Sequence, residues 1–170
     1  MSDVLPWLDY KWSFEFPVGM YRAILERMRG TSARLEEMLE DVPREALMQQ
    51  PNGKWSVLQQ AGHLWVVEAL HHGRIEQYLR GERELVAADM TNRRTQEGNF
   101  NEMPREVVLA HFRESRMKMM SVLDGLTLQD AARTAFHPRL KKELRLADLC
   151  FFAAEHDDHH LAVIRAMLRA

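Results

Sequence analysis

The residues best suited to chemistry are histidines that crowd near the end of the chain. Three of the eight histidines fall in the segment EHDDHH at residues 155–160. On a helix with about 100° between residues, His156 and His160 lie four positions apart and project from one face. That face is apolar along its length, with Leu149, Phe152, Ala153, Val163, Ile164 and Met167. Both histidines are therefore expected to point into the protein.

Two imidazoles one turn apart on a buried face need partners, because a buried polar group without a hydrogen bond is costly. Histidines at positions i and i+4 aim their rings at a common point, an arrangement typical of helical zinc sites. A divalent ion would satisfy both nitrogen lone pairs at once. Ordinary core histidines, hydrogen-bonded to polar neighbours, are the alternative that this spacing leaves open.

A third histidine, His63, is placed to join this pair. It shares a helical face with Val66, Val67 and Leu70, so it also points inward. Facing helices of a bundle commonly build metal sites from inward side chains. Three imidazole nitrogens would leave coordination positions open for water or substrate. They suit zinc, nickel, iron and copper alike; we expect one divalent ion, with zinc or nickel as the first choices.

The polar residues around this pair have less definite roles. Glu155, Asp157 and Asp158 are either acceptors that orient the ligating rings or a solvated flank of the helix. His159 falls at the edge of the apolar face, and its role is open. A zincin-type peptidase is disfavoured, because Asp157 stands where that motif needs a glutamate as general base.

The remaining candidates carry less weight. His71 and His72 lie two turns beyond His63, and His72 faces away from it toward the surface. His111 and His137 have no partner at the spacing of metal ligands. Cys150 is placed off the ligand face of its helix and is interpreted as a structural residue.

Four long helices are predicted to position these side chains. Apolar residues recur at helical spacing over residues 17–40, 57–80, 104–123 and 145–168. Ser56 is a favourable N-cap for the second helix, and Gly81 ends it. Gly30 weakens the expectation of one unbroken first helix. The sequence thus predicts an all-α protein with no strand and no internal repeat.

The connections between the helices are also distinct in sequence. Residues 1–16 are rich in aromatic side chains and form an N-terminal arm, expected to pack Trp7, Trp12 or Phe14 onto the body. Residues 41–55 carry prolines and a glycine, which leaves room for at most one short turn. Residues 81–103 are polar and aperiodic, as in a long loop. Thr127 and Asp130 resemble a capping box for a short extra helical turn.

Composition places the chain in the class of ordered globular proteins. Its 170 residues suit one domain over residues 1–170, with 46% hydrophobic residues and a net charge of −2 from 23 basic and 25 acidic residues. A nucleic-acid partner is not expected, because the chain has no basic surplus or stripe. No apolar run could span a bilayer and no secretory signal is visible, so no membrane partner is expected. The single cysteine fits a reducing cytoplasmic location.

Two segments resemble a known family. KWSVLQQAGHLWVVEAL at residues 54–70, together with LADLCFFAAEHDDHHLAVIRAM at residues 146–167, is similar to the DinB-like superfamily of damage-inducible, YfiT-type proteins. The resemblance implies a four-helix bundle with a long crossover, often assembled as a homodimer. It implies metal ligands at His63, His156 and His160, the same three that the helical positions select. It does not imply DNA binding.

Several functions are compatible with such a site. Three neutral ligands leave the ion its full positive charge, so it would act as a Lewis acid. One function is metal-dependent hydrolysis of a small molecule by activated water. Another, implied by the resemblance, is transfer of a low-molecular-weight thiol onto an electrophile. A non-catalytic metal-binding dimer, acting as a sensor or interaction module, is the alternative from a different class. The sequence does not identify the substrate.

Overall fold

Four long helices form the body of the protein. The computed structural model describes residues 4–169. Its long helices are α1 (Tyr21–Leu39), α3 (Val57–Arg80), α5 (Arg105–Asp124) and α7 (Leu146–Leu168). Helix α3 packs against α5 and α7, and α1 packs against the same two helices from the other side. The predicted four-helix bundle is confirmed, and Gly30 lies inside an unbroken α1.

The two helices that carry the candidate ligands have well-defined starting points. Ser56 Oγ accepts from the Gln59 N–H, and the Gln59 side chain accepts from the Ser56 N–H, which forms a capping box. Gly81 ends α3 in the left-handed conformation, with φ of 73°. The Arg145 N–H donates to Asp148 at the start of α7. The predicted limits of α3 are confirmed residue for residue.

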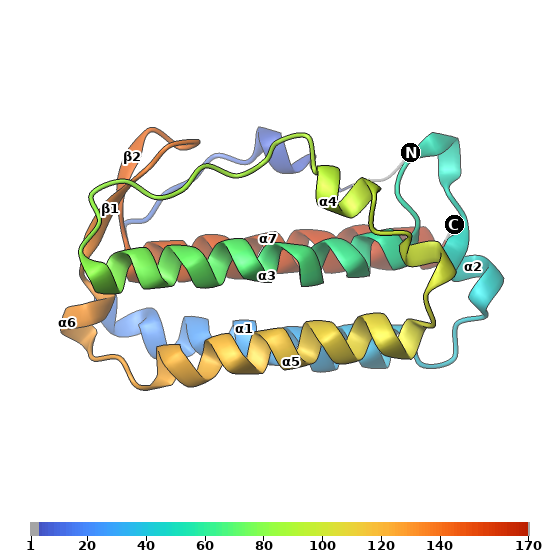
Figure 1. Ribbon diagram of the computed structural model, residues 1–170, viewed down its shortest axis with the longest axis horizontal. Coiled ribbons are helices and arrows are strands. Elements are labelled where there is room, and N and C mark those ends of the chain that lie inside the picture. Colours follow the sequence, from blue (N-terminus) through green and yellow to red (C-terminus); the bar gives the residue numbers. More distant parts are fainter. Residues whose placement is uncertain (1–3, 170) are drawn as a thin grey trace.

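The long loop after α3 gives the bundle its unusual order. Helices α3 and α5 lie side by side and run in the same direction, so residues 81–104 travel back along the length of the bundle (Figure 1). This segment contains the short helices α4 (Arg93–Gln96) and η4 (Phe100–Glu102), which the sequence did not predict. The expected crossover is therefore confirmed, and it lies over α3 rather than projecting from the bundle.

The expectation of a chain without strands is wrong at one place. Strands β1 (Thr134–His137) and β2 (Lys142–Arg145) form an antiparallel hairpin, with Lys141 in a left-handed turn at φ of 54°. The loop after α3 adds to it, because the Phe136 N–H donates to Arg83 O at 2.8 Å. Strands of four residues are too short to show a period, and part of their pairing comes from a distant segment.

The connection before α3 holds more helical structure than expected, and the one after α5 holds the short turn that was expected. Residues 41–55 hold two helical turns rather than one, α2 (Arg44–Met48) and η3 (Pro51–Gly53), because Leu47 is buried and anchors the first of them. Thr127 and Asp130 form the predicted capping box at the start of α6 (Leu128–Ala131). The extra helical turn is thus confirmed.

The core has two apolar clusters with a charged layer between them. One cluster joins the first half of α1 to the first half of α7, and the other joins the opposite halves of those helices. Between them lies a layer of four buried polar residues, one from each long helix: Thr31, Glu68, Arg116 and Asp157. Arg116 donates to both carboxylates and to Met28 O, and Thr31 donates to Asp157. This layer holds α3 and α7 at one axial register.

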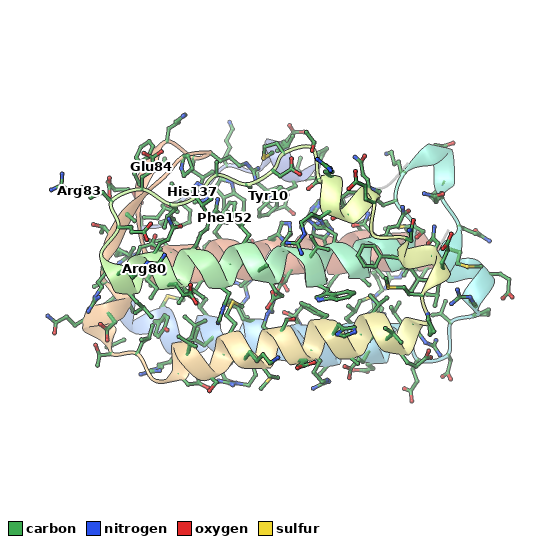
Figure 2. The ribbon with its side chains drawn as sticks, in the orientation of Figure 1. Tyr10, Arg80, Arg83, Glu84, His137 and Phe152 are labelled. Carbon is green, nitrogen blue, oxygen red and sulfur yellow. The ribbon has the colours of Figure 1, made fainter. Side chains whose placement is uncertain are left out.

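The N-terminal arm packs over α7, as predicted. Within it, η1 (Trp7–Asp9) is a short 3-10 turn, and η2 (Val18–Met20) is another between the arm and α1; the arm's first three residues lie outside the described part of the chain. Trp7 and Trp12 contact the Phe152 ring at 5.1 and 4.9 Å between ring centres. Figure 2 shows Tyr10, Phe152 and His137 together on this side of the bundle.

Candidate metal centre

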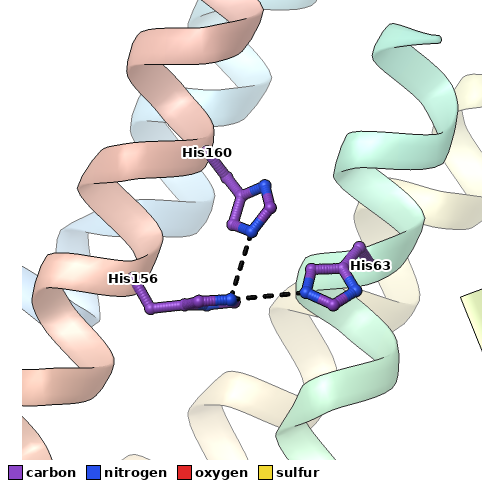
Figure 3. A group of neighbouring side chains, drawn as sticks. All are labelled: His63, His156 and His160. Carbon is purple, nitrogen blue, oxygen red and sulfur yellow. Dashed lines mark hydrogen bonds between the residues drawn. The ribbon is translucent and has the colours of Figure 1, made fainter. Parts of the chain in front are cut away.

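The three histidines selected from the sequence converge on one point between α3 and α7. His63 Nε2 lies 3.3 Å from His156 Nε2, and His160 Nε2 lies 3.1 Å from the same atom (Figure 3). One nitrogen of each ring lies within 4.8 Å of the other two. Tetrahedral zinc with bonds of 2.0–2.1 Å separates its nitrogens by about 3.3 Å. The arrangement has the dimensions of a three-nitrogen metal site.

Neighbouring side chains set which ring nitrogens face inward without a hydrogen. The His160 Nδ1–H donates to Gln60 Oε1 at 2.6 Å, so His160 Nε2 presents a lone pair to the centre. His63 Nδ1 lies 2.9 Å from Thr95 Oγ1, a hydroxyl that can accept its hydrogen, and His63 Nε2 then presents a lone pair as well. Acceptors that bind the second nitrogen of each ring in this way form the usual outer shell of a histidine metal site.

Burial keeps these rings uncharged. Desolvation, followed by the charge of His159, lowers the pKa of His63 to about 4. Desolvation and the neighbouring histidines hold the pKa values of His156 and His160 well below the ordinary value. At neutral pH the three rings are therefore unprotonated bases, which is the state that binds a metal ion.

The hydrogen bonds that the three rings could form among themselves do not satisfy them. His156 Nε2 can carry one hydrogen, but it faces two acceptor nitrogens, and no described residue bonds to His156 Nδ1. With its hydrogen on Nε2, His156 leaves two lone pairs without a donor, one on a neighbouring Nε2 and one on its own Nδ1. A divalent cation at the centre would accept all three lone pairs, so these residues fit the metal that the sequence implied.

The acidic residues beside the histidines do not orient the rings, in contrast to one of their expected roles. Asp157 is fully buried and pairs with Arg116 in the charged layer. Glu155 and Asp158 are partly exposed and pair with Arg27. Residues on a helix point in directions 100° apart, so neighbours of His156 in sequence face other helices. The orienting acceptors come from α3 and the crossover loop instead.

Cys150 has the structural position expected of it, and the role of His159, left open by the sequence, is one of packing. Cys150 is buried away from the histidines, and burial raises the pKa of its thiol to about 12. The thiol is therefore not a nucleophile at neutral pH. His159 is buried beneath the arm, with its ring 5.7 Å from both Trp7 and Tyr10. It packs against aromatic side chains and does not join the three-histidine group.

A cavity of about 550 Å³ opens from the three histidines along the seam between α3 and α7. Small-molecule sites occupy roughly 300–1,000 Å³, so it can hold a substrate. Its apolar walls come from the arm, α3, the crossover loop and α7: Trp7, Leu8, Trp55, Val66, Val67, Leu70, Ala88, Met90 and Phe152. The loop predicted over residues 81–103 borders the site, because residues between Ala88 and Thr95 contribute to this wall.

Sequence reasoning gave too little weight to polar residues at the far end of this cavity. His71 and His137 line it, together with Arg74 and Arg139. His71 is three residues from Arg74 on the same face of α3, a signal that the sequence contained. His137 and Arg139 belong to the hairpin, and only the tertiary fold brings the hairpin to α3. His72, by contrast, is partly exposed, as expected.

Comparison with known proteins agrees with this geometry. The sequence pattern of the DinB superfamily matches residues 25–164, which is most of the chain. The chain belongs to the DinB superfamily. Its fold resembles the solved structure of YfiT from Bacillus subtilis, described as "a probable metal-dependent hydrolase with an unusual four-helix bundle topology". The TM-score is 0.81 at 21% identity, covering 94% of this chain and 92% of YfiT.

A second known protein is similar to this chain along nearly its whole length. A protein of Bacillus pumilus named "Putative metal-dependent hydrolase" is 21% identical over 168 residues, covering 92% of this chain and 96% of the relative. The described residues contain no helix with the length and apolar character needed to cross a bilayer.

Proposed function

We propose that His63, His156 and His160 hold one divalent metal ion, zinc or nickel, and that the protein is a metal-dependent hydrolase of a small molecule. The convergence of three neutral Nε2 atoms at one end of a cavity carries this proposal. The names of the two relatives support the reaction class. When bound, such an ion lowers the pKa of water and polarises a substrate oxygen.

The protein's own residues contribute position and environment. Thr95 and Gln60 keep the rings of His63 and His160 fixed in one tautomer, so the metal site is formed before substrate arrives. Trp7 packs edge-on against the His156 ring at 5.1 Å. Apolar walls exclude bulk water from the reacting centre and strengthen electrostatic interactions there.

Thiol transfer is the second candidate, and one observation favours it. Among the described residues that line the cavity, Asp89 is the sole carboxylate, and there is no serine, cysteine or lysine. Asp89 is occupied by hydrogen bonds from Thr91 and from the Arg93 N–H. Hydrolysis usually gains from a side chain that acts as general base, which here would have to be a histidine of the cavity wall such as His71. Transfer of a thiol held as thiolate by the metal needs none.

Metal content tests the core of the proposal. Elemental analysis of protein purified without a histidine tag should give about one equivalent of a divalent ion. The His156→Ala, His160→Ala double variant should retain almost none. A matched control, His72→Ala with His111→Ala, removes two histidines outside the group and should keep the metal. Absence of metal from the parent protein, even after incubation with zinc or nickel, would overturn the proposal.

Product analysis separates the two reactions. The metal-loaded protein is incubated with panels of esters, amides and epoxides, with and without a low-molecular-weight thiol. Products that gain the mass of water without thiol support hydrolysis, and thiol adducts that form only with the metal-loaded parent support transfer. A metal-loaded protein inactive in every panel would favour the non-catalytic alternative. The homodimer, the cytoplasmic location and the lack of a nucleic-acid partner stay predictions.

A further inference from the structure

The end of the cavity opposite the three histidines carries positive charge without a matching anion. Arg74 is 2% exposed, and it donates to Val86 O through Nε and Nη2 at 3.0 and 2.8 Å. Arg139 stacks over the Trp7 and Phe152 rings at 5.6 and 5.7 Å. Within residues 4–169, neither guanidinium forms an ion pair with a carboxylate. A buried cation without an ion-pair partner destabilises the protein unless an anion binds beside it.

His137 at this end of the cavity cannot accept from both of the donors that face it. Arg74 Nη1 lies 3.1 Å from His137 Nε2, while the Leu140 N–H donates to His137 Nδ1 at 3.2 Å. Burial and Arg74 lower the pKa of His137 to about 4, so the ring is neutral and has a single acceptor nitrogen. A donor faces each ring nitrogen of His137 but only one of the two can accept, which leaves this end of the cavity with a surplus of donors.

His71 lies between this end and the metal centre. It is buried, its ring centre is 6.2 Å from that of His156, and both of its nitrogens have no partner among the described residues. Buried imidazoles with two unsatisfied nitrogens are rare in folded proteins. Since His71 lines the cavity, a ligand in the cavity is the partner that it can reach.

The character of the walls selects the kind of anion. Phosphate groups are commonly bound by free N–H groups at a helix N-terminus. At this cavity the N-terminus of α4 is already occupied, because Asp89 accepts from the Arg93 N–H. The guanidinium fork matches a carboxylate, and the long apolar wall between the two ends suits a hydrocarbon body.

We propose that Arg74, Arg139 and His71 form a carboxylate-binding subsite, so that the substrate is an apolar small molecule with a carboxylate at one end. Its reactive group then lies at the three histidines; this part rests on the proposed function. The Arg139 guanidinium, which has no hydrogen bond to any of the described residues, is the main anchor. Arg74 and His71 supply further donors deeper in the cavity.

Calorimetric titration with a series of probes tests the subsite. The probes are phenyl-substituted carboxylates from benzoate to 6-phenylhexanoate, each paired with its neutral primary amide, together with phenyl phosphate. At least one carboxylate should bind ten times more tightly than its amide, in metal-free and zinc-loaded protein alike. Arg139→Gln should weaken that carboxylate about tenfold and leave the amide unchanged. Lys141→Gln removes the same charge from the same hairpin, outside the cavity wall, and should have no effect.

Several outcomes would overturn the subsite. They are the binding of no carboxylate in the series, equal binding of acid and amide, equal effects of Arg139→Gln and Lys141→Gln, and tighter binding of phenyl phosphate than of every carboxylate. Arg74→Lys keeps the charge but loses the fork, and should weaken the carboxylate without affecting its amide. Metal content, measured on the same samples, separates the proposals. A parent protein without metal that still binds carboxylate through Arg139 would refute the metal function alone.

Discussion

At the scale of single residues, the centre depends on side chains that do not touch the metal position. Thr95 and Gln60 each accept one Nδ1–H, and that single hydrogen bond fixes which nitrogen of the ring faces inward. The acceptor atoms come from different elements, the crossover loop and α3. A ring freed from its acceptor would rotate or change tautomer, and the inward lone pair would be lost.

The first prediction concerns Thr95, which is buried. Thr95→Val keeps the shape of the side chain and removes the acceptor of the His63 Nδ1–H. Metal affinity should fall about 10–100-fold, as for other lost partners of ligating histidines. Competition with a chelator of known affinity measures the change. Thr91→Val, on the same loop but bonded to Asp89, is the control and should bind metal as the parent does.

At the scale of elements, the crossover loop is seated on α3 by one close contact. A Cβ at Gly62 would lie 2.3 Å from the Phe100 ring, and one at Gly98 equally close. The ring thus fits against two glycines, one on the helix and one on the loop. Gly62 precedes His63, and Phe100 follows Thr95 in the loop. This contact therefore sets the distance between the His63 ring and the Thr95 hydroxyl.

Gly62→Ala should therefore damage both stability and the site. The displaced Phe100 ring should lower the free energy of unfolding by about 1–3 kcal/mol, and metal affinity should fall with it. Gly73→Ala is the matched control on the same helix, since a Cβ there meets no atom within 4 Å. It should stabilise by about 0.5–1 kcal/mol through helix propensity. Urea unfolding measures the stability of both variants. Equal effects of Gly62→Ala and Gly73→Ala would contradict the role given to the contact between Gly62 and Phe100.

The charged layer is the second feature at this scale. Arg116→Met would leave two carboxylates, Glu68 and Asp157, buried without their cation. The free energy of unfolding should fall by about 3–5 kcal/mol. Arg113 lies on the same helix as Arg116 and forms a more exposed ion pair with Glu36. Arg113→Met breaks that pair and should lower the free energy of unfolding by under about 1 kcal/mol.

Simultaneous replacement tests the cause of that loss. Arg116→Met combined with Glu68→Leu and Asp157→Leu removes all three charges, so most of the stability should return. A triple variant as unstable as Arg116→Met alone would show that the loss comes from altered packing instead of an uncompensated charge.

At the scale of the whole molecule, buried neutral histidines couple stability to pH. Burial lowers the pKa of His71 to about 3 and those of His63 and His137 to about 4. In the unfolded chain these rings take up protons below about pH 6.5. The unfolded state then binds more protons, so the stability present above pH 6.5 is lost as the pH falls toward 4.

The expected loss for metal-free protein is about 1 kcal/mol per pH unit for each such ring, between pH 6 and pH 4. Urea unfolding at half-unit steps of pH measures the slope. His71→Leu removes one of these rings and should make the slope shallower by that amount. His72→Leu is the control, because that ring is partly exposed. A His71→Leu slope equal to that of the parent would refute the coupling.

Much of this architecture follows from local sequence. Ser56 and Gly81 mark the ends of α3 because capping and a positive φ are properties of a few adjacent residues. His156 and His160 project together because the helical repeat alone places them one turn apart. Membership of the three-histidine group could be predicted for the same reason, since each ring shares its face with apolar neighbours on its own helix.

Contacts between distant segments account for what the sequence did not reveal. Thr95 and Gln60 could not be recognised as partners of the rings, and Asp157 has neither of the two roles left open for it, because it is buried against Arg116. The hairpin with His137 and Arg139 reaches the cavity only once the Phe136 N–H pairs with Arg83 O, from a distant segment of the chain. Hydrogen-bond partners and cavity walls depend on the packing of whole helices and loops. Periodicity within one segment does not predict that packing.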